Sequence, residues 1–166
     1  MAHLLEPSDA WREAFLELAR EYEAAGEPRY ALALGDFDAF LERLRARRAG
    51  DGLAEAEVPV VELWLEQDGR LIGCVRIRLG LNAELEREGG HVGYDIRPSL
   101  RGRGHGTELL RLALLRARAL GLTRIRITCD DDNLGSIRVI ERNGGMLCGT
   151  DTSSDSGKLI RQYWID

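Results

Sequence analysis

The spacing of apolar residues changes along the chain, first following a helical repeat and later alternating with polar residues. Residues 8–22 carry apolar or aromatic side chains at intervals of three and four, which predicts an amphipathic helix with Ser8 or Asp9 as its N-cap. A second helix is predicted over residues 37–47, because Asp36 is a suitable N-cap and arginines gather in the last turn, where the helix dipole favours them.

After a predicted loop over residues 47–59, the repeat shortens to two. Residues 60–79 indicate two strands joined at Asp68-Gly69, a dipeptide typical of two-residue hairpin turns. Arg76 and Arg78 alternate with apolar residues, so one face of the second strand is predicted to be exposed to solvent. The elements predicted after this hairpin are a strand over 91–98, a helix from Thr107 to about Gly121, a strand over 124–129, a helix over 134–142, and strands over 146–149 and 160–165.

This order of elements, α-α-β-β-β-α-β-α-β-β, predicts an α/β fold with a mixed sheet. The chain of 166 residues suits a single domain over residues 1–166. A domain of this size buries roughly 70% of its unfolded surface, so it needs neither disulfides nor metals to fold. The three cysteines, Cys74, Cys129 and Cys148, lack the spacing of a metal site and are expected to be small buried residues, so no metal is predicted.

The overall charge and the apolar runs narrow the range of partners. A net charge of −5 argues against a general affinity for nucleic acid and is compatible with a cationic acceptor. The first residues lack the basic start and apolar run of a signal peptide, and no apolar run approaches the ~18 residues that cross a membrane. We therefore expect a cytoplasmic protein with no nucleic-acid and no membrane partner.

Three glycines precede the predicted helix that begins at Thr107. A helix start leaves four N–H groups unpaired and carries about half a positive charge, so it attracts anions. Glycine accepts positive φ and lets a phosphate approach the main chain. Gly102, Gly104 and Gly106 therefore predict a phosphate cradle, and Arg101, Arg103 and His105 between them add charge.

A simple tight turn is the alternative, but a turn needs one or two glycines rather than three interleaved with basic residues. Two nucleotide motifs fail on spacing. No Gly-Lys-Ser/Thr of a P-loop occurs, and Thr107 stands where the dinucleotide fingerprint has its third glycine.

The segment IRPSLRGRGHGTELL resembles the pyrophosphate-binding motif of the GNAT superfamily of N-acetyltransferases, R/Q-x-x-G-x-G/A, which Arg101, Gly104 and Gly106 match. The downstream segment DNLGSIRVIERNGG is similar to the second motif of the family, with Asn133 and Ser136 in the matching positions. Longer runs such as ITCDDDN and QYWI resemble a bacterial branch described only as predicted acetyltransferases. The resemblance extends from about residue 58 to the end and is less specific for the first helices.

This resemblance implies a GNAT-like fold, in which helices flank a central mixed and twisted sheet. It also implies direct transfer of an acetyl group from acetyl-CoA to an amine. It places the coenzyme A pyrophosphate at residues 101–107, the pantetheine arm along Tyr94 to Ile96, and Asn133 and Ser136 on the far side of that arm. Helix capping is an equally good explanation for Asn133. The cofactor-binding residues implied are Tyr94, Ile96, Arg101, Gly102, Arg103, Gly104, His105, Gly106, Thr107, Asn133 and Ser136.

The reaction needs a neutral amine, and neutralising a lysine-like amine at pH 7 costs about 4.6 kcal/mol. His91 and Asp95, on one face of a predicted strand, are candidates for a base or relay. The alternatives are a hydrogen-bonded strand histidine and a solvated carboxylate. Asp130 to Asp132 are best explained as a solvated turn.

Many members of the family have a tyrosine four residues after the small residue of the second motif, where it acts as an acid toward the leaving thiolate. That position is Ile140 here, so Tyr163, water, or no donor at all takes this role. The acceptor stays open, as a small-molecule or peptide amine shaped by loops 23–35 and 80–90. Dimers are frequent in the family, and a non-catalytic acyl-CoA-binding sensor is the alternative function.

Overall fold

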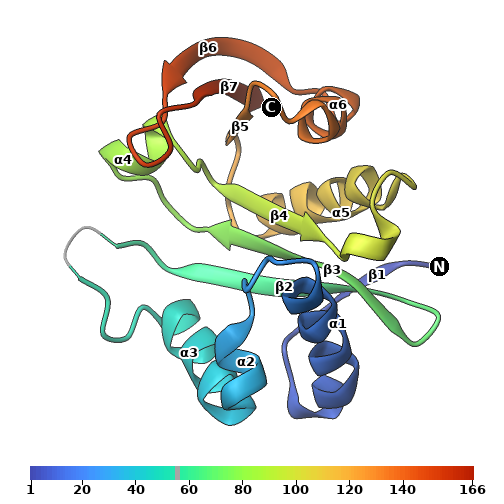
Figure 1. Ribbon diagram of the computed structural model, residues 1–166. Coiled ribbons are helices and arrows are strands. Elements are labelled where there is room, and N and C mark those ends of the chain that lie inside the picture. Colours follow the sequence, from blue (N-terminus) through green and yellow to red (C-terminus); the bar gives the residue numbers. More distant parts are fainter. Residues whose placement is uncertain (55–56) are drawn as a thin grey trace.

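The computed structural model describes residues 1–54 and 57–166, so residues 55 and 56 of the predicted loop over 47–59 lie outside the described residues. Figure 1 shows α1, α2 and α3 on one side of a sheet and α5 on the other. The elements are β1 (His3–Leu5), α1 (Arg12–Ala24), α2 (Ala31–Gly35), α3 (Phe37–Ala49), β2 (Val60–Gln67), β3 (Arg70–Arg78), α4 (Ala83–Arg87), β4 (Val92–Ile96), α5 (His105–Ala119), β5 (Ile125–Asp130), α6 (Leu134–Arg142), β6 (Met146–Thr152) and β7 (Leu159–Ile165), with 3-10 turns at Asp9–Trp11 and Pro98–Leu100.

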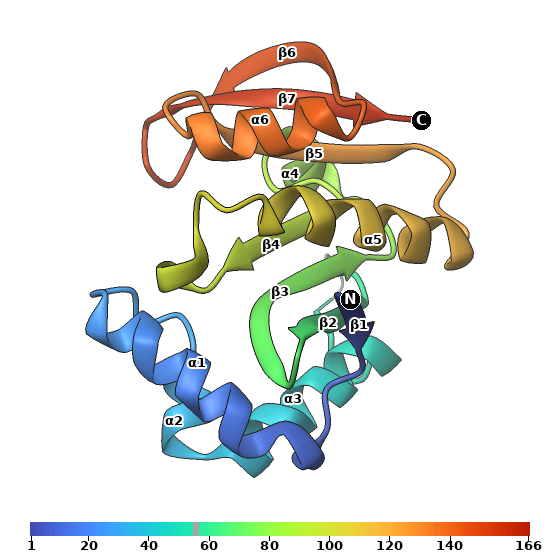
Figure 2. The ribbon, with the colours of Figure 1, turned by 90° about the vertical axis from the view of Figure 1, so that its right-hand side faces the viewer.

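The strands form two sheets, with the orders β1-β2-β3-β4 and β5-β7-β6, and every neighbouring pair within them is antiparallel. The sheets meet where β4 and β5 begin, through a bridge between Gly90 and Ile127 and a hydrogen bond of 2.8 Å from the N–H of His91 to the carbonyl of Arg126. Beyond this junction, no ladder joins β4 to β5 in the described part of the chain. Figure 2 shows the two strands running in the same direction, which makes the whole arrangement mixed, as predicted.

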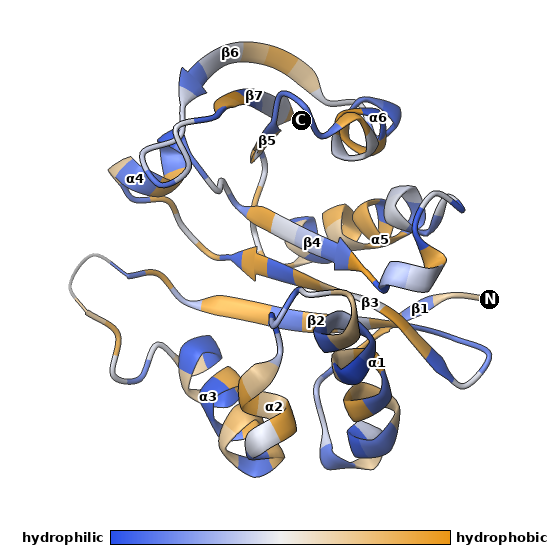
Figure 3. Cartoon of the chain, viewed as in Figure 1, coloured by the Kyte–Doolittle hydropathy of each residue, from blue (hydrophilic) through white to orange (hydrophobic). Residues whose placement is uncertain are grey.

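Two apolar clusters lie on opposite faces of the first sheet. One contains Leu63 and Leu65 of β2 together with residues of α5, and the other contains Trp64 together with aromatic residues of α1 and α3. Both faces of β2 are therefore buried, and Figure 3 shows the apolar colour at the start of this strand, interrupted by polar residues further along. The alternation read from the sequence decides which cluster each side chain joins.

Several local predictions are confirmed. The Asp36 carboxylate accepts a hydrogen bond of 2.9 Å from the N–H of Ala39 and so caps α3, while Gly50 ends this helix with a φ of 79°. Asp68 and Gly69 have φ values of 54° and 78°, as a hairpin turn of the I′ type requires. The bounds predicted for α6 agree with the structure.

The amphipathic helix predicted over residues 8–22 is present, as a 3-10 turn followed by α1. Other expectations are wrong. The side chain of Ser8 makes no capping hydrogen bond within the described residues, and the N-cap position of α1 is Trp11. Cys74 is buried as expected, but Cys129 is only partly buried and Cys148 is exposed. The face of β3 predicted to be exposed to solvent is covered. The side chain of Arg76 is only 18% exposed and forms an ion pair with Asp95 of β4.

Three short elements have no counterpart in the predictions. β1 is fixed by pairing with the edge of β2, from His3 opposite Glu66 to Leu5 opposite Trp64. The helices α2 and α4 lie within the loops 23–35 and 80–90, and each has only five residues. Elements this short depend on tertiary contacts, because a helix of one or two turns is unstable alone.

Candidate active site

A cavity of about 610 Å³ lies between β4, the turn that leads into α5, one side of α6 and the loop between α1 and α2. The described residues that line it are Glu27, Arg29, Tyr94, Asp95, Ile96, Leu100, Arg101, Gly102, Gly104, Gly106, Thr107, Asn133, Gly135, Ser136, Arg138, Val139 and Arg142. The structure thus brings together residues from both sequence motifs. A volume of this size is typical of small-molecule sites.

The turn before α5 presents unpaired main-chain amides to this cavity. Gly102 and Gly104 have φ values of 73° and 87°, in the left-handed region that favours glycine. In the described part of the chain, no protein atom accepts a hydrogen bond from the N–H groups of residues 102–106. The carbonyl of Gly104 instead accepts from Thr107 and Glu108, at 3.1 and 3.3 Å, and so starts the helix. Unpaired amides at the positive end of a helix dipole are suited to an anion.

Gly106 differs from the other two glycines. It lies inside α5, which begins at His105 rather than at Thr107. A Cβ atom there would approach Cγ2 of Val139 to 3.1 Å, whereas a Cβ atom at Gly102 or Gly104 would meet open space. Gly106 therefore lets α5 and α6 pack closely, and the positive φ values of Gly102 and Gly104 shape the turn.

The side chain of Arg101 ties this turn to the loop between α1 and α2. Its Nε donates to the carbonyl of Ile96 at 3.0 Å, and its two terminal nitrogens donate to the carboxylate of Glu27 at 2.7 and 2.9 Å. The bond to Glu27 raises the pKa of the guanidinium. Arg103 is exposed, His105 is partly buried, and neither is among the described residues that line the cavity.

Tyr94 connects β4 to the start of α6 across the cavity. Its hydroxyl lies 2.8 Å from Oγ of Ser136, and burial raises its pKa. The side chain of Asn133 accepts a hydrogen bond of 3.0 Å from the N–H of Ser136 and caps α6, as the capping interpretation predicted. Asn133 and Ser136 also line the cavity, so capping and ligand contact are compatible.

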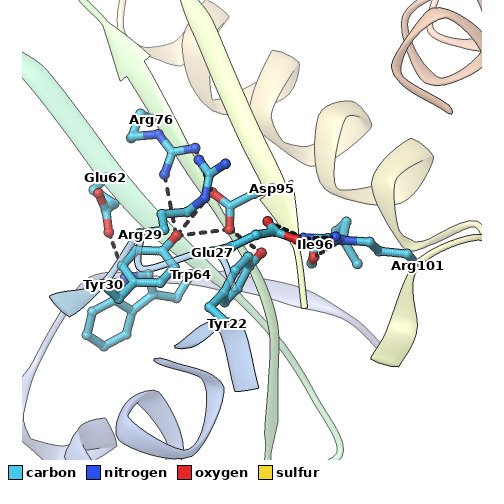
Figure 4. A network of polar contacts seen from close by, with 10 residues as sticks. All are labelled: Tyr22, Glu27, Arg29, Tyr30, Glu62, Trp64, Arg76, Asp95, Ile96 and Arg101. Carbon is cyan, nitrogen blue, oxygen red and sulfur yellow. Dashed lines mark hydrogen bonds and ion pairs between the residues drawn. The ribbon is translucent and has the colours of Figure 1, made fainter. Parts of the chain in front are cut away.

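Asp95 lies at the other end of the cavity, in a buried network of polar contacts (Figure 4). Its carboxylate accepts hydrogen bonds from the hydroxyls of Tyr22 and Tyr30, at 2.6 and 2.9 Å, and from Arg76 at 2.6 Å. Arg29 is 3.7 Å away. The solvated-carboxylate alternative is therefore wrong, because the residue is only 8% exposed. Burial and the charge of Asp95 raise the pKa of Tyr22.

His91 and Tyr163 are not among the described residues that line the cavity. The Nδ1 atom of His91 accepts a hydrogen bond of 2.9 Å from the N–H of Arg126, and burial lowers the pKa of this histidine. The hydroxyl of Tyr163 donates to Glu141 at 3.3 Å, and its ring is fully buried, as is Ile140. Of the three catalytic candidates, the structure brings only Asp95 to the cavity.

The acidic residues Asp130 to Asp132, at the end of β5, form ion pairs with basic side chains. Asp131 pairs with Arg161 at 2.6 Å, and Asp132 pairs with Lys158 at 3.0 Å.

Within the described residues, no group of three or more His, Cys, Asp or Glu side chains is arranged to hold a metal ion. In the same part of the chain, no helix is both long and apolar enough to cross a membrane.

The chain is thus an α/β protein whose cavity is bordered by main-chain amides suited to a phosphate-bearing ligand. The sequence profile of the Acetyltransferase (GNAT) family matches residues 11–145. The chain therefore belongs to the GNAT acetyltransferase family, and it is an N-acetyltransferase that uses acetyl-CoA, as its two motifs predicted.

Solved structures of acetyltransferases share this fold. The microcin C7 self-immunity acetyltransferase MccE, in complex with acetyl-CoA and AMP, has 18% identity and a TM-score of 0.74, over 99% of this chain and 91% of that chain. RimJ of Mycobacterium smegmatis, in complex with CoA-disulfide, has 18% identity and a TM-score of 0.76, over 99% and 81%. The aminoglycoside acetyltransferase AAC(6')-Ib, in complex with coenzyme A, has 18% identity and a TM-score of 0.69, over 99% and 94%. A search of curated proteins finds no significant match.

Proposed function

We propose that the turn over residues 101–107 binds the pyrophosphate of acetyl-CoA and thereby presents the thioester to an amine near Asp95. The observation that carries this proposal is the row of unpaired amides at residues 102–106, which borders a cavity large enough for a cofactor arm. Phosphate oxygens need several donors at once, and a row of main-chain amides at a helix N-terminus supplies them.

The pantetheine arm would lie along β4. In the described part of the chain, β4 pairs with β3 on one side only, and its other edge carries no ladder. Amides of the arm can pair with this free edge as an added strand does. Tyr94 and Ile96 border the cavity at this edge, and the hydroxyls of Tyr94 and Ser136, which lie 2.8 Å apart, are polar groups near the path of the arm.

At the far end, Asp95 would accept a hydrogen bond from the incoming amine and orient its nitrogen toward the thioester. Roles for His91 and Tyr163 stay predictions, and so do a homodimer and a cytoplasmic location. The acceptor is a small-molecule or peptide amine. The names of the similar structures support a range of acceptors for this fold, because one is an aminoglycoside enzyme and another a self-immunity enzyme.

A pair of glycine variants tests the cradle. Gly104 and Gly121 lie at opposite ends of α5, and both have positive φ and open space where the methyl group of an alanine would stand. Alanine at either site costs about 1–2 kcal/mol of stability because of the left-handed backbone. We expect only Gly104→Ala to weaken coenzyme A binding in calorimetry, by about tenfold or more, because its methyl group stands where the phosphate approaches. Equal affinity in the two variants would remove the cradle assignment.

Gly106→Val is a poorer test of the cradle, because the new side chain would also collide with Val139 of α6. Turnover is tested separately, by the release of free thiol from acetyl-CoA in the presence of diverse amines. Tight coenzyme A binding without thiol release on any amine would favour the acyl-CoA sensor instead.

A further inference from the structure

A second, smaller cavity of about 150 Å³ lies beside the first, on the face of the sheet that α2 and α3 cover. Arg29 lines both cavities, and the wall between them contains the hydrogen bond from Tyr30, in the second cavity, to Asp95, in the first. The described residues that line the second cavity are Arg29, Tyr30, Leu32, Phe40, Arg43, Leu44, Arg47, Glu62 and Arg76.

Positive charge dominates this second cavity, in a chain whose net charge is −5. Its lining contains four arginines and one glutamate. Asp95 neutralises Arg76 at 2.6 Å, whereas Arg43 and Arg47 have no carboxylate within ion-pair distance in the described part of the chain. Glu62 is the one carboxylate among the described lining residues, and its side chain accepts a hydrogen bond from Trp64.

Arg78, two residues after Arg76 on β3, adds a further positive charge near this cavity. Its guanidinium donates to the carbonyls of Gly89 and Gly90, at 3.3 and 3.1 Å, rather than to a carboxylate. Burial lowers the pKa of Arg78, and the charges of Arg76 and Arg47 lower it further. Like charges held together in a partly buried space destabilise the protein, and a bound anion relieves that repulsion.

We infer that the second cavity binds an anionic group, a carboxylate or a phosphate, that belongs to the acceptor amine. This inference rests on the proposed function, since it assigns the acceptor to the Asp95 end of the first cavity. Asp95 attracts the amine in the first cavity, and Arg43 and Arg47 attract the anionic group in the second cavity, which Arg29 also borders. The acceptor is therefore a small molecule with one amine and one anionic group, rather than a polyamine.

Binding of a small anion tests the cavity without any need for turnover. The protein is first saturated with coenzyme A, so that the cradle is occupied, and inorganic phosphate is then titrated while the amide NMR signals of α3 and β3 are followed. We expect saturable shifts in the wild type and about tenfold weaker binding in Arg43→Gln/Arg47→Gln. Arg45→Gln is the matched control, because Arg45 is exposed on the same helix and is not among the described residues that line the cavity.

Absence of saturable shifts, or equal binding by the double variant and the wild type, would overturn the inference. If the protein does not bind coenzyme A, the proposed function fails, but the same phosphate titration on the free protein still decides the anion site. The two failures are therefore distinguishable.

Matched amine pairs then identify the anionic group through thiol release. The pairs are 4-aminobutyrate with butylamine, and 3-aminopropyl phosphate with 3-aminopropanol. In the wild type, the anionic member of at least one pair should have a kcat/KM about tenfold above that of its neutral partner, and the better pair tells carboxylate from phosphate. The double variant should lose this preference and Arg45→Gln should keep it. A preference for the neutral members, or for spermidine, contradicts the inference.

Discussion

The buried carboxylate of Asp95 should contribute strongly to the free energy of unfolding, because polar groups from several elements bond to it. The variant Asp95→Asn tests this contribution. The wild-type carboxylate accepts hydrogen bonds from Tyr22, Tyr30 and Arg76 at 2.6–2.9 Å while only 8% exposed. Asparagine keeps the shape but removes the negative charge, so the guanidinium of Arg76 is left without its ion-pair partner. Arg29, at 3.7 Å from the carboxylate, loses the same charge.

Breaking a buried ion pair by removing one partner costs about 3–5 kcal/mol, because the remaining charge is not compensated. For a chain of this length, that loss corresponds to a fall in Tm on the order of 10 °C. Urea denaturation followed by circular dichroism measures the free energy of unfolding, and an unchanged m-value would show that the loss belongs to the folded state.

A double-mutant cycle adds a second variant, Arg76→Met, which removes the positive charge of the pair. In the double variant Asp95→Asn/Arg76→Met the buried guanidinium of Arg76 is no longer left without a partner, so its loss should be about 2 kcal/mol smaller than the sum of the two single losses. Two results would refute the reasoning. One is a loss below about 1 kcal/mol for Asp95→Asn, which would mean that water solvates the site. The other is strict additivity of the two variants.

Three further predictions concern stability and reactivity. Burial raises the pKa of Glu21, but bonds from Arg97 and from the N–H of Ser99 together lower it below the ordinary 4.5. The folded state thus holds this proton less tightly than the unfolded state, so the stabilisation is complete above pH 4.5 and lost as the pH falls. The difference in the free energy of unfolding between wild type and Glu21→Gln should therefore become smaller in thermal denaturation at low pH. A constant difference down to about pH 3 would contradict this. Mass spectrometry should find rapid alkylation of the exposed Cys148, slow alkylation of Cys129, whose pKa burial raises to about 11, and none of buried Cys74 until the protein unfolds. Gly73→Ala should lose about 2 kcal/mol in denaturation, since its Cβ would lie 2.3 Å from the carbonyl oxygen of Asp95, and a neutral effect would show that β3 and β4 can separate.

Local signals explain how much of the fold the sequence could predict. The hairpin at Asp68-Gly69 depends on two backbone angles that this dipeptide adopts readily, and the cap of α3 depends on one aspartate. The glycine turn before α5 was predictable for the same reason, because glycine conformation and the unpaired amides of a helix start are properties of neighbouring residues, while its role as a phosphate cradle stays a prediction.

The other end of the site was not predictable in this way. Tyr22 lies on the apolar face of α1, Tyr30 comes just before α2, and Arg76 follows the polar repeat of β3, so each has a sufficient local explanation. Only the packing of α1 and α2 over the sheet brings their polar ends to Asp95. His91 and Asp95 share a predicted face, but their hydrogen-bond partners lie on different elements, which alternation alone does not reveal.

The separate pairing of the two sheets has a consequence for the order in which the chain folds. The hairpins β2–β3 and β6–β7 join residues close in sequence, such as Gln67 with Arg70 and Thr152 with Leu159. In contrast, β1 must find β2 across all three N-terminal helices. Contacts between distant segments are entropically slow to form, so pulse-labelling hydrogen exchange should show the two hairpins protected first and β1 last. The first cavity, assembled from both halves of the chain, would then be completed only after each half has its own strands in register.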